Sequence, residues 1–172
     1  MSSYWGVYVL MERNKRGVGR IDVNRLDPGD NEEPDISGGY IIQRDRIKFD
    51  DVGISANGYS NIVVEYPSKP TTAQRNYIQD YLGDAIGTLN PNMGSQANSP
   101  MIDFQSLLDH HILNWYCKNV DALRLSTYMY KPRGGKLFFG PMWDIDRALG
   151  GNDPRAVSPT GFHNDNISFK CR

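Results

Sequence analysis

The stretch NVDALRLSTYMYKPRGGKLFFGPMWDIDR, residues 119–147, decides the fold because it holds two strand-like runs and the turn between them. ALRLSTYMY and KLFFGPMW are rich in apolar and aromatic residues, and the intervening KPRGG is typical of a hairpin turn. The two ends of a hairpin lie side by side. We therefore expect Asp121, which follows a predicted helix, to converge with Ser126 and Asp144 on one site.

These three side chains have the pattern that phosphoryl transfer to a hydroxyl group needs. One carboxylate orients the nucleophile and accepts its proton, and a second holds Mg²⁺ against the phosphates. Protein kinases use an Asp, a metal-binding Asn five residues later, and a hairpin leading to a second Asp. Asp121 has the first position here, Ser126 the Asn position, and Asp144 the second Asp position. Mg²⁺ keeps several waters, so few protein ligands are enough.

The rest of the chain predicts strands first and helices afterwards. TTAQRNYIQDYLGDAIGTL (71–89) has apolar residues at helical spacing and Thr71 or Thr72 as its N-cap. Asp103 can cap a second helix over 104–119. Its apolar positions are expected to share one face, and they are Phe104, Leu107, Leu108, Ile112 and Trp115. Strands are expected over 5–13, 20–26, 38–46 and 61–67, with a turn at Asn57-Gly58. This order predicts an α+β fold.

Composition narrows the classes of protein that the chain can represent. Its 172 residues suit one domain, 1–172, with an acidic flexible loop at 27–35 and a polar tail at 152–172. A net charge of −1 argues against a nucleic-acid polymer as partner, and no apolar run is long enough for a membrane span. The first residues do not have the order of a signal peptide. Cys117 and Cys171 form no metal-binding pair, and their pairing stays unassigned.

The chain resembles the CotH kinase-like family, that is, spore-coat protein H and its secreted relatives. The resemblance covers most of the sequence and lies in YWGVYVLMER, GGYIIQRDR, VVEYP, KNVDALRLSTYMYK and above all GPMWDIDRALG. It implies an atypical protein-kinase-like fold with mixed or antiparallel strands, two main helices and a catalytic hairpin. Because the family's domain normally begins upstream of YWGVYVLMER, the resemblance makes this chain the C-terminal part of such a domain.

The resemblance also implies an activity and roles for residues. The implied activity is transfer of the γ-phosphoryl group of ATP, with Mg²⁺, to Ser or Thr of spore-coat or extracellular proteins. Such substrates would place the chain outside the cell, at the cell surface or in the spore coat. Asp121 and Arg147 would be catalytic, and Asp144, Asp146 and Ser126 would hold the metal. Glu12 would line the nucleotide cleft, and Arg44 is a candidate for the cation that pairs with phosphate.

Other interpretations of the same residues stay open. Asp144 or Asp146 could cap a helix that starts near Arg147. Relatives often carry Lys where this chain has Gln43, and Asn where it has Ser126, which favours a non-catalytic structural or binding module with the same fold. The adjacent His110 and His111 point in different directions on a helix, so a structural role is expected for them.

Overall fold

A five-stranded sheet with two helices makes up the body of the protein. The computed structural model describes residues 5, 6, 8, 10–89, 99–122, 124–151, 153–158 and 160. The sheet has the order β2-β3-β1-β4-β5, and every pairing in it is antiparallel. Its strands are β1 (Tyr40–Arg44), β2 (Gly53–Ala56), β3 (Tyr59–Tyr66), β4 (Thr127–Lys131) and β5 (Phe138–Phe139), preceded by a 3-10 turn, η1 (Asp35–Ser37). The α+β class is confirmed, with strands and helices segregated along the chain.

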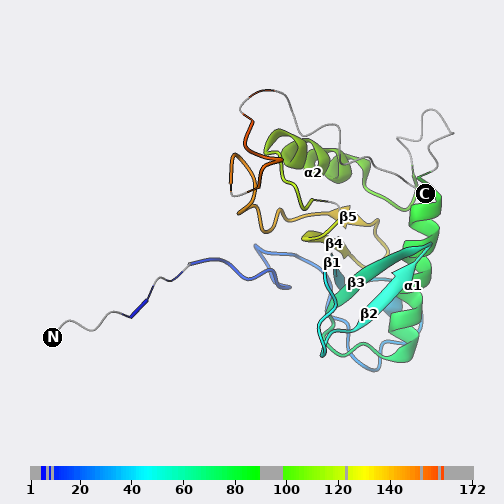
Figure 1. The fold of residues 1–172 in the computed structure, drawn as a ribbon. Helices are drawn as coiled ribbons and strands as arrows, with labels where there is room; N and C mark the ends of the chain where they lie inside the picture. Colours follow the sequence, from blue (N-terminus) through cyan, green and yellow to red (C-terminus); the bar gives the residue numbers. More distant parts are fainter. Residues whose placement is uncertain are drawn as a thin grey trace.

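Helix α1 (Thr72–Gly87) covers one face of the sheet (Figure 1). Thr71 is its N-cap in a capping box, in which Gln74 N donates to the Thr71 hydroxyl and Thr71 N donates to Gln74 Oε1. The Gln74 amide also donates to the carbonyl oxygens of Asp27 and Asp30, so the helix start anchors the 27–35 loop. The core below α1 is formed by side chains of four strands and the helix: Tyr40, Ile42, Ile54, Ile62, Ile78, Leu82 and Met129.

Helix α2 (Phe104–Tyr116) packs at the β5 edge of the sheet, and the predicted cap is correct, because Ser106 N donates to Asp103 Oδ1 at 2.8 Å. The predicted apolar positions lie on this helix, but only Leu107 among them packs against the core. The buried residues of α2 are His110 and Asn114, whereas its exposed large apolar side chains are Leu108, Ile112, Leu113, Trp115 and Tyr116. The reason is that α2 faces a short edge strand and the loop after it rather than the centre of a sheet.

His110 and Asn114 form a small polar contact inside this interface. The Asn114 amide donates to the His110 carbonyl oxygen at 2.8 Å, and the His110 ring lies 6.1 Å from the ring of Phe139. Burial lowers the pKa of His110 to about 4, so the imidazole is neutral at physiological pH. The structural role expected for this histidine agrees with these contacts.

The N-terminal predictions need correction. The described residues between 5 and 13 belong to no strand, and they run away from the body (Figure 1), with Trp5 and Leu10 largely exposed. The described sheet ends at β2 on one edge and at the two-residue β5 on the other, and these residues pair with neither. The 20–26 segment forms only an isolated bridge at Ile21, yet Ile21 and Val23 pack on the second face of the sheet against Ile41 and Tyr128.

The other predicted strands and turns are observed. The 38–46 and 61–67 predictions correspond to β1 and β3, and Asn57-Gly58 joins β2 to β3 with positive φ at both residues. The 122–143 hairpin is β4 and β5. Of the predicted polar tail, Asp153 and Ala156 are buried, and the segment with Cys171 lies outside the described residues. No helix in the described part is both long and apolar enough to cross a membrane.

Gly38 allows the turn before β1 to approach the β4–β5 connection closely. Its φ of −175° is ordinary extended backbone, but a Cβ at this position would lie 2.1 Å from Arg133 N. We expect Gly38→Ala to lower the free energy of unfolding by about 2 kcal/mol or more, because two backbone segments would have to separate.

Gly83→Ala is the matched control, since Gly83 lies inside α1 and a Cβ there meets nothing within 4 Å. It should stabilise the protein by about 0.5–1 kcal/mol through helix propensity. Urea unfolding of both variants measures the difference. Equal stability of Gly38→Ala and the wild type would contradict the close approach.

Candidate active site

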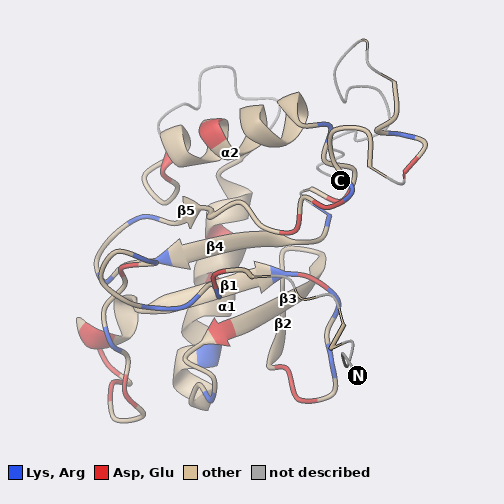
Figure 2. Cartoon of the chain, turned by 90° about the vertical axis from the view of Figure 1, so that its left-hand side faces the viewer, with Lys and Arg blue, Asp and Glu red and all other residues tan. Residues whose placement is uncertain are grey.

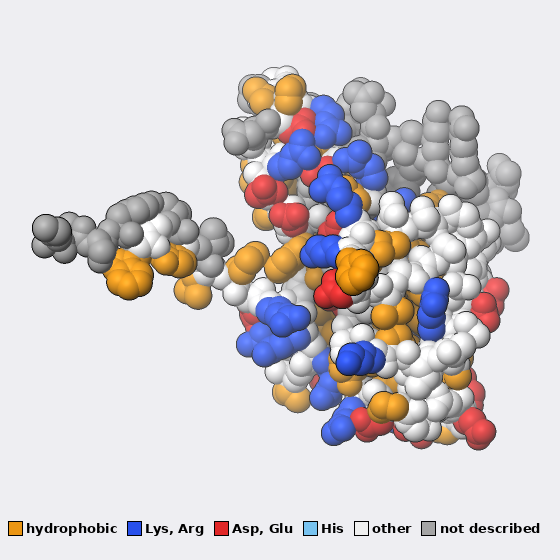
Figure 3. Space-filling model, turned by 60° about the horizontal axis from the view of Figure 1, so that its bottom comes forward, with side chains coloured by type: hydrophobic (Ala, Val, Ile, Leu, Met, Phe, Trp, Pro, Cys, Tyr) orange, Lys and Arg blue, Asp and Glu red, His pale blue; other side chains and the backbone are white. Residues whose placement is uncertain are grey.

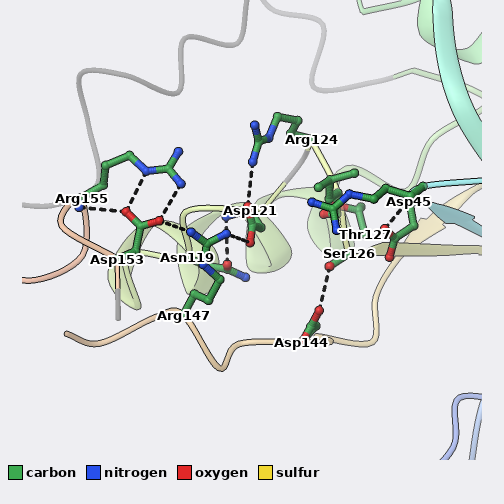
Figure 4. A network of polar contacts seen from close by, with 12 residues as sticks. Asp45, Asn119, Asp121, Arg124, Ser126, Thr127, Asp144, Arg147, Asp153 and Arg155 are labelled. Carbon is green, nitrogen blue, oxygen red and sulfur yellow. Dashed lines mark hydrogen bonds and ion pairs between the residues drawn. The ribbon is translucent and has the colours of Figure 1, made fainter. Parts of the chain in front are cut away.

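Ser126 and Asp144 meet where the hairpin formed by β4 and β5 begins and ends. Ser126 precedes β4, Asp144 follows the chain's exit from β5, and the Ser126 hydroxyl donates to Asp144 Oδ2 at 3.2 Å (Figure 4). Both residues have left-handed backbone, with φ of 53° and 56°. Such conformations are uncommon for residues other than glycine and cluster at functional sites. The structure thus brings together two of the three residues predicted to converge.

A second carboxylate lies beside Asp144. The pKa of Asp144 is raised by partial burial and by the like charge of Asp146, while the hydrogen bond from Ser126 opposes the shift. Turns rather than a helix follow Asp146 in the described chain, which removes the interpretation of these aspartates as helix caps. The result is a set of oxygen ligands with uncompensated negative charge, and a divalent cation would relieve that repulsion.

Asp45 is a third carboxylate near this site, and sequence reasoning missed it. In the pairing of β1 with β4, Arg44 lies opposite Thr127, so the next residue, Asp45, continues toward Ser126. The Gln43 amide donates to Asp45 Oδ2 at 2.8 Å, and Arg46 N donates to Asp45 Oδ1 at 2.7 Å. The charge of Asp45 adds to the increase in the pKa of Asp144. Only the register between two strands far apart in sequence could have revealed it.

Asp121 belongs to a neighbouring ionic network. Its side chain is 15% exposed, and its two oxygens accept from Arg124 Nη2 at 2.7 Å and from Arg147 Nη1 at 2.9 Å. The Asn119 side chain accepts from Asp121 N and donates to the Asn114 side chain, which ties the loop to α2. In Figure 4 this network lies next to the pair of Ser126 and Asp144 without a drawn contact between them.

Arg147 continues the network to Asp153. Its second terminal nitrogen donates to Asp153, whose side chain is 5% exposed and also accepts from Arg155 Nε and Nη2, both at 2.8 Å. Arg155 N donates to the same carboxylate at 2.9 Å, and these hydrogen bonds hold the pKa of Asp153 well below its usual range. Arg147 therefore bridges Asp121 and Asp153. Asp153 and Arg155 lie in the predicted polar tail, where no motif or periodicity indicated a functional residue.

Glu12 and Arg44 lie apart from the carboxylates. Glu12 pairs with Arg20 at 2.6 Å and lines a groove of about 580 Å³ between the N-terminal segment and the chain after β5. Trp143, which directly precedes Asp144, lines the same groove and contacts Tyr128 edge-on. Arg44 stacks over Tyr59, 5.0 Å from the ring centroid, on the face that α1 covers. The structure thus places Arg44 on the opposite face from Gln43 and does not bring it to Asp144.

The charged residues are concentrated in loops. Figure 2 shows acidic and basic positions mostly at the ends of the strands, while the strands themselves are largely uncharged. On the face seen in Figure 3, Lys and Arg side chains gather in more than one place around hydrophobic side chains. The wall of the groove beside Glu12 includes the basic residues Arg13 and Lys15 and the aromatic rings of Tyr130 and Phe139.

The residues at the site fit a hard divalent cation with a mostly aqueous coordination shell. Asp144, Asp146 and Ser126 offer only oxygen atoms, which Mg²⁺ prefers, and the pKa of Asp144 is raised first by burial and then by the like charge of Asp146. Within the described residues no group of three or more His, Cys, Asp or Glu side chains could hold a metal ion, so a cation here would have few protein ligands.

One comparison with known proteins gives a result. The family model described as CotH kinase protein matches residues 2–170, which is nearly the whole chain. No curated protein and no solved structure shows significant similarity to the chain.

The raised pKa of Asp144 gives a prediction for stability in the absence of metal. Because the folded-state pKa lies above the unfolded value, the contribution of Asp144 to stability is present at low pH and is lost as pH rises through the folded pKa. Asp144→Asn keeps an acceptor for Ser126 and removes the repelling charge. We expect the variant to melt at an equal or higher temperature than the wild type at pH 7 in EDTA.

The difference should disappear toward pH 3, where the wild-type carboxyl is also protonated. Thermal melts followed by circular dichroism at both pH values test this. A lower melting temperature of Asp144→Asn at pH 7 would show that the charge of Asp144 is already compensated in the metal-free protein.

Proposed function

The chain belongs to the CotH kinase family, and from that premise we propose that it is an atypical protein kinase. It would transfer the γ-phosphoryl group of ATP to a Ser or Thr hydroxyl of a protein acceptor. The observation that carries the proposal is the contact of Ser126 with Asp144 at the hairpin end, with Asp146 beside it. The acceptor would be a spore-coat or extracellular protein, as the resemblance to secreted relatives implies.

Each group in the site has a proposed task. Asp144, Asp146 and Ser126 would hold Mg²⁺, which neutralises charge on the phosphate oxygens when it is bound. Asp45 would add a negative charge where β1 approaches the site. That charge would repel a phosphate group that has no bound cation. The nucleotide would lie in the groove beside Trp143, where Glu12 and the basic residues Arg13 and Lys15 form one wall.

Asp121 would orient the acceptor hydroxyl and take its proton. In the transfer, a bond forms between the acceptor oxygen and the γ-phosphorus while the bond from that phosphorus to the ADP oxygen breaks. Arg147 holds Asp121 Oδ2 and is itself fixed by Asp153, so the carboxylate has one orientation.

A non-catalytic binding module is a second candidate function, and Gln43 is the observation that favours it. Gln43 is 8% exposed and donates to Asp45 at the position where relatives often carry Lys, so it supplies no cation for phosphate. Calorimetric titration of the protein with ATP and Mg²⁺ separates the two functions. Binding of the nucleotide supports the kinase, and its absence at millimolar ATP supports the module.

Asp144→Ala tests the catalytic assignment. Loss of the principal metal ligand should reduce Mg²⁺-dependent ATP turnover by at least about a hundredfold, since a metal contributes several kcal/mol to transition-state stabilisation. Asp80→Ala, an exposed carboxylate on α1, is the matched control and should turn over ATP like the wild type. Equal turnover by Asp144→Ala, with its fold intact by circular dichroism, would rule out Asp144 as the metal ligand.

A further inference from the structure

Residues 12–23, which we call the covering segment, pack on the sheet face where Gln43 lies. On that face Ile21 packs against Ile41 and Tyr128. Because side chains two positions apart in a strand share a face, Gln43 lies on the same side of β1 as Ile41. In the pairing of β1 with β4, Gln43 is directly opposite Tyr128. The covering segment therefore lies over the strand position where relatives often carry Lys and this chain carries a neutral amide.

Tyr128 links the covering segment to the candidate metal ligands. Burial raises the pKa of Tyr128 to about 12, and the Asn14 side chain opposes the rise, which places it at the Tyr128 hydroxyl group. The Trp143 ring meets the Tyr128 ring edge-on, with 5.8 Å between the ring centroids. Asn14 directly precedes Lys15, and both line the groove that Trp143 also lines. Since Trp143 directly precedes Asp144, Lys15 and Asp144 are each one residue from a side chain at Tyr128.

A turn with two glycines holds the covering segment in place. Gly17 N donates to the Ile21 carbonyl oxygen at 3.1 Å, and Gly19 has a φ of 73°, which residues with a Cβ rarely adopt. The Arg16 guanidinium group stacks over the Tyr66 ring, 5.5 Å from its centroid. In protein kinases a glycine-rich loop covers the phosphates of the nucleotide. This turn precedes β1 in the chain and carries basic residues, which suits the same task.

Lys15 is the basic residue of the covering segment whose charge is available for a ligand. Arg20 Nη1 lies 2.6 Å from Glu12 Oε1, so these two charges compensate each other. Burial raises the pKa of Glu65, and Arg13 is one of the cations that oppose the rise, so its charge acts on that carboxylate. The Lys15 side chain is exposed, and in the described part of the chain its ammonium group has neither an ion pair nor a hydrogen bond.

The carboxylates near the expected phosphate position make a cation necessary there. The charges of Asp146 and Asp45 both act on Asp144. A bound Mg²⁺ would offset two of these three charges, so the triphosphate of ATP would still meet net repulsion. Gln43 contributes no charge on this face. The argument for a cation is therefore the need to pair with phosphate beside carboxylates, and it does not depend on a surface with excess positive charge.

We propose that Lys15 binds the phosphate groups of ATP and so replaces the lysine that β1 lacks at Gln43. This rests on the proposed function, because Lys15 lines the groove in which the nucleotide would lie. The ammonium group would pair with phosphate oxygens from the covering segment, while Asp144 and Asp146 would hold Mg²⁺ from the chain after the hairpin. The cation thus comes from a turn that packs on the sheet and not from a strand within it.

Calorimetric titration with three ligands tests this assignment without any need for turnover. ATP, adenosine and inorganic tripolyphosphate would each be titrated in the presence of Mg²⁺. We expect Lys15→Gln to weaken the binding of ATP and of tripolyphosphate by about tenfold and to leave the binding of adenosine unchanged, because only the first two ligands carry phosphate. Lys15→Arg keeps the charge and should retain most of the affinity for ATP.

Lys69→Gln is the matched control, because Lys69 is an exposed lysine between β3 and α1 and does not line the groove. It should bind ATP like the wild type. Adding Gln43→Lys to the Lys15→Gln variant should restore the affinity for ATP, since it returns a cation to the covered face. A folded double variant that stays weak would contradict the replacement. Lys15→Gln changes only an exposed side chain, so it tests phosphate binding even if the double variant does not fold.

The outcomes separate phosphate binding from catalysis. Selective loss of ATP and tripolyphosphate affinity in Lys15→Gln, in a protein that turns over no ATP, would support Lys15 and contradict the proposed kinase activity. Turnover with an equal KM for ATP and an equal ATP affinity in Lys15→Gln and the wild type would overturn the role of Lys15 and leave the kinase standing. No binding of any of the three ligands at millimolar concentration would overturn both.

Discussion

A buried ammonium group fixes the strand from which the candidate site is built. Lys131 ends β4 and is 2% exposed, and its Nζ donates to the carbonyl oxygens of Gly135 and Ser37 while lying 4.3 Å from the centroid of the Tyr81 ring. Burial lowers its pKa. Because a buried cation without partners costs several kcal/mol, β4 cannot shift along its axis without losing contacts to η1, to the hairpin turn and to α1 at once.

The position of β4 determines what meets at its other end. Its register with β1 sets Arg44 against Thr127, and this directs Asp45 toward Ser126. Ser126 and Asp144 then leave the hairpin with left-handed backbone and a hydrogen bond between them. Strand pairing thus brings Asp45 from one part of the sequence to the end of the sheet where Asp144 and Asp146 lie. The contacts that fix the positions of the strands lie in the core, and the charged groups lie at the ends of the strands, outside the core.

Features of the sequence predicted correctly those caps and turns that are formed by residues close together in the chain. Thr71, one of two expected candidates, and Asp103 are the N-caps of α1 and α2, and Asn57-Gly58 forms the expected turn. Predictions that depended on distant partners failed. The 5–13 segment has the composition of a strand, but its described residues pair with neither edge strand, β2 or β5. Most apolar positions of α2 face outward because the helix packs at the sheet edge. Asp45 and Asp153 were missed for the same reason.

Arg147 joins the two chemically different halves of the site. On one side are Asp144 and its neighbouring carboxylates, which concentrate negative charge; on the other are the guanidinium groups around Asp153. Arg147 lies three residues after Asp144, and its two terminal nitrogens contact Asp121 and Asp153. The loop that carries the candidate metal ligands is therefore held in place by Asp121. A shift of that loop would also change the orientation of Asp121. In the proposed reaction, the position of the phosphate at Asp144 and the position of the acceptor hydroxyl at Asp121 would therefore change together.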